Sequence, residues 1–267
     1  MTKRILVVPD IHGRTFWKDP VEKYIDRVDR IVFLGDYLDP YHGDTGLAPV
    51  IVENLREIIA LKLNNREKVI LLKGNHDEHY SSDLFYELAS GSRLDKQNWT
   101  TYHQLFNDFK DVFQIAHLEE TQHLPYLFTH AGLTVYWLNK LNEKFWHLDE
   151  SRISLTDPDI IDRINTLDTN ELGQGMLAVV GKCRSLFLGE KTGSVLWADI
   201  EEHPMPDAPN IYGLNQVFQV FGHTRIDKDD MDMVLFENLA MIDTQQCFMI
   251  DDSMKERIVT VRDYERI

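Results

Sequence analysis

The stretch from Lys73 to His79 concentrates chemically capable side chains in a short span. It reads Lys-Gly-Asn-His-Asp-Glu-His and directly follows the apolar run Val69–Leu72. Amide, imidazole and carboxylate groups at this density can bind a metal ion or move a proton. The same residues also suit a solvated loop, because Gly-Asn is a common turn pair. The choice between the two depends on whether similar groups follow other apolar runs.

Four other apolar runs end in the same kind of residue. Because the carboxyl ends of parallel strands meet at one edge of a sheet, groups placed there converge on one crevice. Each motif alone is a weak signal, since a single histidine is more often a core or surface residue than a ligand. All five motifs in order form a strong signal. Besides the stretch after Val69–Leu72, the motifs are Asp10-Ile11-His12 after residues 5–8, Gly35-Asp36 with Asp39 after residues 31–34, His130 after residues 127–129, and Gly222-His223 after residues 217–221.

The types of these side chains indicate which metal they could hold. Carboxylate, imidazole and amide oxygen without thiolate suit Mn²⁺, Fe or Zn²⁺. Two such ions about 3.5–4 Å apart can stabilise both the attacking and the leaving oxygen of a displacement at phosphorus. The two cysteines, Cys183 and Cys247, have no metal-type spacing, so we expect two reduced thiols.

The first half of the chain alternates between strand-like and helix-like segments. Apolar runs at residues 5–8, 31–34 and 68–72 are separated by a loop and helix at 15–28 and a helix at 49–63. Strands alternating with helices predict βαβ units and a largely parallel sheet. Because the strands are apolar throughout, both faces of the sheet should be covered.

The rest of the chain predicts further helices, a helical insertion and a β-rich end. We expect a single domain over residues 1–267, with residues 133–190 forming a helical cap insertion that includes helices at 159–165 and 171–180. Outside the cap, helices are predicted at 82–90 and 102–109, and strands at 112–118, 126–129, 217–221, 233–236, 240–242, 247–250 and 258–261.

Composition and charge exclude several classes of function. Lys and Arg number 28 against 44 Asp and Glu, which gives a net charge of −16. This excess disfavours general nucleic-acid binding, because phosphates are repelled unless metals or a basic patch intervene. No apolar run is long enough to span a membrane. The apolar run near the start is too short for a signal peptide, so we expect a cytoplasmic protein.

The five motifs together resemble those of the calcineurin-like metallophosphoesterases, and among them the branch of serine/threonine phosphatases and diadenosine tetraphosphatases. The family pattern is D-x-H, G-D-x-x-D, G-N-H-[DE], a histidine and G-H-x-[HT]. The resemblance covers residues 10–224. It implies a four-layer α/β/β/α sandwich of two mixed β-sheets flanked by helices. The matching motifs are Asp10-x-His12, Gly35-Asp36-x-x-Asp39, Gly74-Asn75-His76-Asp77, His130 and Gly222-His223-Thr224.

The resemblance also implies a role for each motif residue. Two divalent metal ions are expected, manganese first, with iron, zinc and nickel as alternatives. Their ligands would be Asp10 and His12 for the first ion, Asp36 as the bridge, and Asn75, His130 and His223 for the second. A metal-bridging hydroxide would attack phosphorus. His76, oriented by Asp39, would protonate the leaving oxygen as the general acid.

The chain departs from that branch where arginine usually holds the phosphate. Pro40 follows G-D-x-x-D, and Lys73 precedes G-N-H. Lys73 offers a point charge rather than a bidentate fork. The candidate substrate-binding residues are therefore Lys73 with three arginines near the motifs, Arg14, Arg184 and Arg225. Tyr37, Tyr41 and His42 lie near the expected mouth, where they could stack on a base or simply pack.

The leading functional hypothesis is a dinuclear-metal-dependent phosphomonoesterase acting on a phosphorylated small molecule, nucleotide or phosphoprotein. A phosphodiesterase or dinucleoside-polyphosphate hydrolase remains an alternative. So does a non-catalytic scaffold of the same fold, although the presence of every expected ligand and of His76 argues against it.

Overall fold

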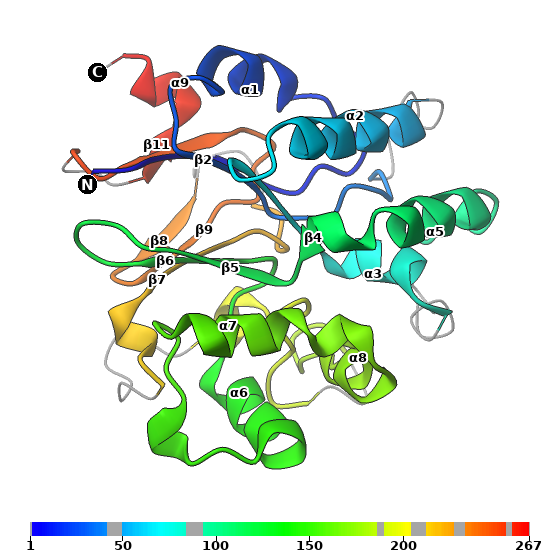
Figure 1. The fold of residues 1–267 in the computed structure, drawn as a ribbon, viewed down its shortest axis with the longest axis vertical. Coiled ribbons are helices and arrows are strands. Elements are labelled where there is room, and N and C mark those ends of the chain that lie inside the picture. The colour runs from blue at the N-terminus through cyan, green and yellow to red at the C-terminus, as the bar shows by residue number, and fades with distance from the viewer. Residues whose placement is uncertain are drawn as a thin grey trace. The chain divides into compact units, whose positions relative to one another are not determined.

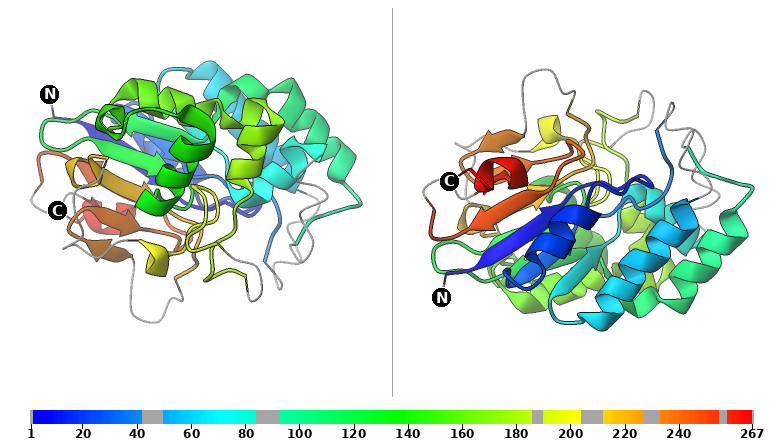
Figure 2. Two further views of the ribbon diagram at one scale, coloured as in Figure 1. Left: turned by 90° about the horizontal axis from the view of Figure 1, so that it is seen from below. Right: turned by 90° about the horizontal axis from the view of Figure 1, so that it is seen from above.

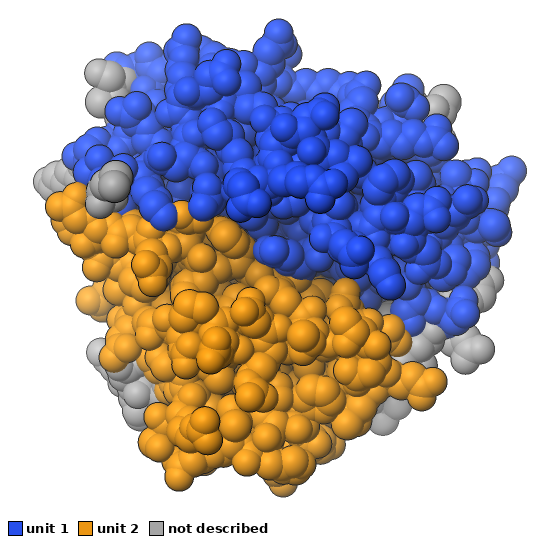
Figure 3. Space-filling view, viewed as in Figure 1, with its two compact units in different colours: residues 1–114, 245–267 blue, residues 115–244 orange. Residues whose placement is uncertain are grey.

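The computed structural model describes residues 2–41, 50–83, 93–185, 190–203, 212–226, 233–254 and 258–266. The chain forms two compact units, coloured separately in Figure 3. Unit 1 comprises residues 1–114 and 245–267, and unit 2 comprises residues 115–244. Each unit contains one mixed β-sheet and its own helices. The predicted fold class, two mixed sheets flanked by helices, is confirmed.

The sheet of unit 1 has six strands in the order β11-β10-β1-β2-β3-β4. Strands β1 to β4 run parallel to one another, whereas β10 is antiparallel to β1 and β11 is antiparallel to β10. The parallel part agrees with the βαβ pattern of the sequence. The strands are β1 (Arg4–Val8), β2 (Arg30–Phe33), β3 (Val69–Leu72), β4 (Phe113–Gln114), β10 (Phe248–Asp251) and β11 (Ile258–Thr260).

Helices of unit 1 pack on one face of this sheet, where α1 and α2 are visible in Figures 1 and 2. Alternate strand residues such as Leu6, Val8, Ile31 and Phe33 join the helices in one buried apolar cluster. That spacing places them on one face, because side chains alternate along a strand. The helices are α1 (Lys18–Tyr24), α2 (Ile51–Asn64), α3 (Asn75–Ser81), α5 (Trp99–Asp108) and α9 (Val261–Tyr264), with a 3₁₀ turn at Lys110–Val112.

The sheet of unit 2 has five strands in the order β5-β6-β7-β9-β8. Strands β6, β7 and β9 are parallel, while β5 and β8 pair antiparallel at the two edges. The carboxyl ends of β6 and β7 therefore lie side by side, which places the segments that follow them together. The strands are β5 (Ala116–Glu119), β6 (Tyr126–Thr129), β7 (Phe218–Phe221), β8 (Val234–Phe236) and β9 (Leu239–Met241).

The helices predicted at 159–165 and 171–180 are present in unit 2. Helix α7 begins with a capping carboxylate, because Asp157 accepts from the backbone N–H of Asp159, and proline occupies its first position. The helices here are α6 (Val135–Leu141), α7 (Pro158–Asn165) and α8 (Glu171–Leu177), with a π-helical turn at Asn142–Trp146. Short 3₁₀ turns lie at Glu150–Arg152, Leu167–Thr169, Ile200–Glu202 and Leu214–Gln216.

The strand predicted over residues 112–118 is wrong, because the chain changes sheets in the middle of it. Strand β4 ends at Gln114 in one sheet, and β5 begins at Ala116 in the other. The side chain of Asn165, at the end of α7, accepts from the N–H groups of Ile115 and Ala116 at 2.9 Å each. This side chain satisfies backbone groups at the point where the chain leaves the first ladder.

Two expectations from the sequence concern residues outside the described ranges. Most of the helix predicted at 82–90, and also His42, fall outside them. Among the residues that are described, no helix is long and apolar enough to cross a membrane.

Candidate active site

The loop after β1 holds Asp10 and His12 in the interior of unit 1. Both side chains are buried, and one carboxylate oxygen of Asp10 lies within 4.8 Å of one of Asp36. The backbone N–H groups of Ile11 and His12 both donate to the carbonyl of Asp36, at 3.1 and 2.6 Å. These bonds fix the first loop against the loop that follows β2.

The ring of His12 presents a lone pair to the carboxylate of Asp36. Its Nδ1 lies 2.9 Å from the carbonyl oxygen of Leu38, which can only accept, so Nδ1 carries the hydrogen. Burial lowers the pKa of His12 to about 3, so the ring is neutral near pH 7. Its Nε2 then faces Oδ2 of Asp36 at 3.5 Å with no hydrogen between them. Two electron-rich atoms in this position fit a bound cation, as a metal site requires.

Two glycines let the loops after β2 and β3 approach closely. Gly35 has a φ of +104°, which favours glycine, and a Cβ there would overlap the backbone of Gly74. A Cβ on Gly74 would in turn overlap the side chain of Asp36. The close approach allows Oδ1 of Asp36 to accept from the N–H of His76 at 2.9 Å.

Asp77 ties the same two loops together. Its side chain is fully buried and accepts three backbone hydrogen bonds, from the N–H groups of Asp36 (2.7 Å), Tyr37 (2.8 Å) and Gly74 (2.8 Å). Burial and the nearby Asp36 carboxylate raise the pKa of Asp77, while the three N–H donors act in the opposite direction. Asp77 therefore has a structural role beneath the loops that carry the candidate ligands.

His76 lies in the first turn of α3, paired with Asp39. Its Nδ1 is 2.8 Å from Oδ2 of Asp39, and the other oxygen of Asp39 accepts from the hydroxyl of Tyr80. Tyr80 in turn accepts from the backbone N–H of Asp95 at 2.7 Å. Both oxygens of Asp39 are thus held, so the imidazole orientation is fixed and Nε2 is the ring nitrogen turned away from Asp39. Asn75, the first residue of α3, is buried beside it.

In unit 2, His130 and His223 follow the adjacent parallel strands β6 and β7. Nε2 of His130 and Nδ1 of His223 are 3.1 Å apart. The N–H of Gly222 donates to the carbonyl of His130 at 2.9 Å, which joins the two loops. The indole of Trp197 meets the His223 ring edge-on, with 6.0 Å between ring centroids. Two imidazole nitrogens that converge in this way are a suitable pair of ligands for one metal ion.

Strained backbone is concentrated at these positions. Seven non-glycine residues among those described have a positive φ, and four of them are predicted site residues. The four are His12 (45°), Asp36 (51°), Asp39 (56°) and His223 (69°). Such conformations cost free energy and persist where the surrounding structure enforces them, which is common at functional sites.

The four predicted substrate-binding cations lie in different environments. Lys73 is buried and pairs with Glu78 at 3.4 Å, so its charge is already compensated inside unit 1. Arg184 pairs with Asp199 at 3.0 Å and donates to Thr224, next to His223. Arg225 is exposed. The guanidinium of Arg14 lies 4.9 Å from the centre of the Tyr41 ring.

Several residues at the site were not predicted from the sequence. Tyr80 lies four positions after His76 on the same face of α3, a spacing that could have pointed to it. Arg93 brings Nη2 to 3.3 Å from Nε2 of His76, and no sequence pattern pointed to it. His203 stacks on Phe221, with ring centroids 4.8 Å apart, and burial lowers its pKa to about 4.

The two described tyrosines near the expected mouth both have partners inside the protein. Tyr37 is buried, and its hydroxyl donates to the carbonyl of Leu72 at 2.9 Å. Tyr41 meets the edge of the His12 ring and lies against two guanidinium groups, those of Arg14 and Arg93.

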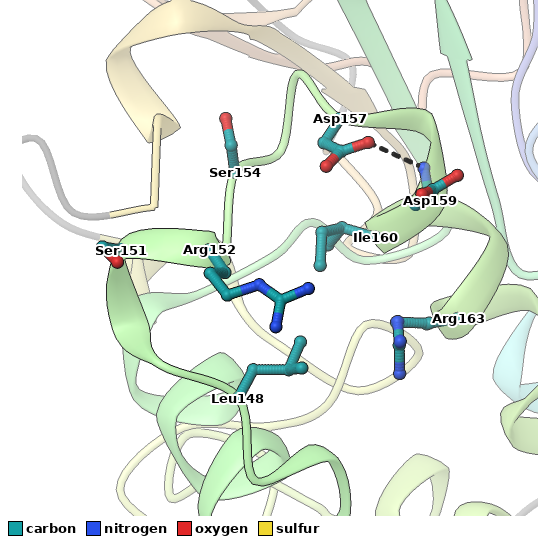
Figure 4. A pocket seen from close by; sticks show the side chains of 8 residues that line it. All are labelled: Leu148, Ser151, Arg152, Ser154, Asp157, Asp159, Ile160 and Arg163. Carbon is teal, nitrogen blue, oxygen red and sulfur yellow. Dashed lines mark hydrogen bonds between the residues drawn. The ribbon is translucent and has the colours of Figure 1, made fainter.

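A pocket of about 310 Å³ lies in the helical part of unit 2 and contains none of the predicted site residues. Figure 4 shows the side chains of Arg152 and Arg163 extending toward the same space, near Leu148 and Ile160. The pocket falls within residues 133–190, the predicted insertion. Its lining residues are Leu148, Ser151, Arg152, Ser154, Asp157, Asp159, Ile160 and Arg163.

Comparisons with known proteins agree with the motifs and the fold. A family model described as calcineurin-like phosphoesterase matches residues 3–223. The crystal structure of a cold-active protein-tyrosine phosphatase from a psychrophilic Shewanella species is similar, with a TM-score of 0.57 and 15% identity over 98% of this chain and 81% of that one. A 1.1 Å structure of a cold-active protein tyrosine phosphatase gives a TM-score of 0.52 and 16% identity, over 98% and 79% of the two chains. Curated protein sequences give no match. The structural likeness shows a shared fold.

Proposed function

Since the chain belongs to the calcineurin-like phosphoesterase family, we propose that it is a metal-dependent phosphomonoesterase. The observation that carries this proposal is the pairing of His12 with Asp36, a lone pair and a carboxylate that face each other in a buried site. The imidazole of His76, held by Asp39, adds a group able to move a proton close to those residues. A phosphatase fold among the similar structures supports the same reaction class.

The proposed ligands are the residues that the motifs predicted. Asp10 and His12 would hold one divalent ion, Asp36 would bridge, and Asn75, His130 and His223 would hold the second. Manganese is the proposed metal, with iron, zinc and nickel as alternatives, because the donor set has oxygen and imidazole but no thiolate. When bound, two such cations lower the pKa of water and neutralise the charge of the phosphoryl group.

The proposed catalytic proton donor is His76. Because Nδ1 faces Asp39, the proton available to a leaving oxygen is on Nε2. Asp39 acts as a positioning residue, and Tyr80 holds the second oxygen of that carboxylate so that it cannot rotate away. The dyad thus presents one nitrogen in one direction, as protonation of a departing alcohol or phenol requires.

The proposed substrates are phosphate monoesters, in a small molecule, a nucleotide or a phosphoprotein. The insertion at residues 133–190 is proposed to shape specificity, and the pocket in Figure 4 shows that it offers space lined by two arginines. Cytoplasmic location and the absence of general nucleic-acid binding stay predictions of the sequence. The alternatives to a phosphomonoesterase are a phosphodiesterase, a dinucleoside-polyphosphate hydrolase and a non-catalytic scaffold. The following test distinguishes the proposed function from them.

The test compares para-nitrophenyl phosphate with bis-para-nitrophenyl phosphate, using protein that has been chelated and then given Mn²⁺, Fe²⁺, Zn²⁺ or Ni²⁺. We expect metal-dependent hydrolysis of the monoester and a loss of at least about a hundredfold in kcat for His76→Asn with metal binding retained. Preference for the diester would instead make the protein a phosphodiesterase. Hydrolysis that His76→Asn leaves unchanged would remove His76 from the mechanism, and failure to bind any metal would leave a scaffold.

A further inference from the structure

Arg93 lies directly beside the proposed proton donor. Its Nη2 is 3.3 Å from Nε2 of His76, the ring nitrogen that Asp39 leaves free. In the proposed reaction, Nε2 of His76 meets the leaving oxygen of the substrate. A side chain within hydrogen-bonding reach of Nε2 can therefore also reach the other oxygens on the same phosphorus atom. Arg93 reaches this place from the connection between α3 and α5, outside every motif of the sequence.

Within the described part of the chain, no acid balances the positive charge of Arg93. None of the ion pairs between described residues includes Arg93, and its Nη1 is buried without a hydrogen-bond partner. Lys73, which precedes α3, is by contrast buried against Glu78. A buried guanidinium donor without an acceptor costs free energy, and an anion placed there would remove that cost.

The ring of Tyr41 provides a surface for this guanidinium. The central carbon of Arg93 lies 4.1 Å from the ring centre, within the range of a cation–π contact. Arg14 also lies over Tyr41, at 4.9 Å, and the edge of the His12 ring meets it with centroids 4.5 Å apart. Tyr41 therefore connects two arginines to a residue proposed to bind metal, and it holds Arg93 without neutralising its charge.

We propose that Arg93 is a substrate-binding residue that donates hydrogen bonds to the phosphoryl oxygens beside His76, with its guanidinium held against Tyr41. The ligand is a phosphate monoester or inorganic phosphate, whose several charged oxygens match the planar fork of arginine. This inference rests on the proposed phosphoesterase function. It places the phosphate-binding arginine outside the motifs, whereas the sequence predicts phosphate contacts at Lys73, Arg14, Arg184 and Arg225.

The experiment measures the binding of inorganic phosphate and the hydrolysis of para-nitrophenyl phosphate by metal-loaded protein. The variants are Arg93→Ala, Arg93→Lys and, as a matched control, Arg27→Ala, which removes an exposed arginine from the same unit. Calorimetric titration gives the dissociation constant for phosphate without any turnover. Steady-state kinetics gives KM and kcat separately. Thermal unfolding shows that each variant is folded.

Arg93→Ala should raise both the phosphate dissociation constant and KM by about tenfold to a hundredfold, the usual effect of losing a charge-assisted hydrogen bond. Arg93→Lys should recover only part of this, because lysine cannot bind bidentately, and Arg27→Ala should match the wild type. Unchanged phosphate binding and KM in Arg93→Ala would overturn the inference, even in an active enzyme. A fall in kcat alone would also overturn it, because Arg93 would then act only on His76. The wild-type protein could also fail to hydrolyse both para-nitrophenyl phosphate and bis-para-nitrophenyl phosphate. If Arg93→Ala still weakened its phosphate binding, Arg93 would be upheld as the anion site and the proposed function would be refuted.

Discussion

Replacing Asp77 should destabilise unit 1 by an amount that its hydrogen bonds set. In Asp77→Ala three buried N–H groups, those of Asp36, Tyr37 and Gly74, lose their acceptor. Each buried donor left unsatisfied costs about 1–3 kcal/mol, so the expected loss is about 3–9 kcal/mol before relaxation. Asp77→Asn keeps one oxygen, which can still serve the N–H groups of Asp36 and Gly74. Only Tyr37 then lacks an acceptor, and the expected loss is about 1–3 kcal/mol.

Urea unfolding followed by tryptophan fluorescence measures these differences. The protein is kept free of metal by chelation, so that altered ligands do not contribute to the free energy of unfolding. Asp26→Ala serves as the control, because Asp26 is an exposed acid of the same unit and its loss should change stability by no more than about 0.5 kcal/mol. A loss of less than about 1 kcal/mol in Asp77→Ala would refute the reasoning. So would equal losses in the two Asp77 variants, since the count of donors could not then explain them.

Three further outcomes are expected from the same geometry. Gly74→Ala should lower kcat/KM for para-nitrophenyl phosphate by at least about tenfold, because its Cβ would displace the side chain of Asp36; wild-type kinetics would contradict this. Tyr80→Phe, which frees one oxygen of Asp39, should lower kcat by less than the loss in His76→Asn and leave metal affinity unchanged; a shift in metal content would argue against a purely positioning role. Burial lowers the folded-state pKa of His203 to about 4, below its value in the unfolded chain, so the folded state favours the neutral ring. The neutral ring's contribution to the free energy of unfolding is complete above about pH 6.5 and is lost as the pH falls toward 4. Between pH 7 and pH 5 the free energy of unfolding should drop by about 2 kcal/mol on this account, and urea titrations of His203→Gln should lack that part of the slope.

The parts of the fold that the sequence predicted well are those where the pattern is local. Residues 5–8, 31–34 and 68–72 are continuous apolar runs, and β1, β2 and β3 occupy nearly the same positions. The loops after them carried ligand-type residues next to glycines, a combination that short-range chemistry explains. The strand predicted at 112–118 is wrong because the chain changes sheets at Ile115, whose N–H donates to Asn165, a partner about fifty residues away along the chain.

The parts of the site that could not be predicted depend on contacts between distant segments. Lys73 was a natural candidate for substrate binding, but the buried pairing with Glu78 emerges only when α3 folds back over the loop. Arg93 shares no motif with His76, and a lone arginine in a connection has no spacing that marks it. Tyr80 was within reach of sequence reasoning, because the distance of four residues from His76 already places it on the same helical face.

The neighbours of β1 have a consequence for how the protein is made. Strand β1 pairs with β2 on one side, but its other neighbour, β10, is encoded far downstream, after the whole of unit 2. At the usual rate of about 5–20 residues per second, a ribosome needs roughly ten to fifty seconds to add the intervening segment of about 240 residues. During that time the edge of β1, whose residues 5–8 are all fully buried in the finished fold, has no strand beside it. Unpaired apolar edges recruit other chains. The yield of native protein should therefore depend on chaperones that cover nascent chains and on the speed of translation between β2 and β10.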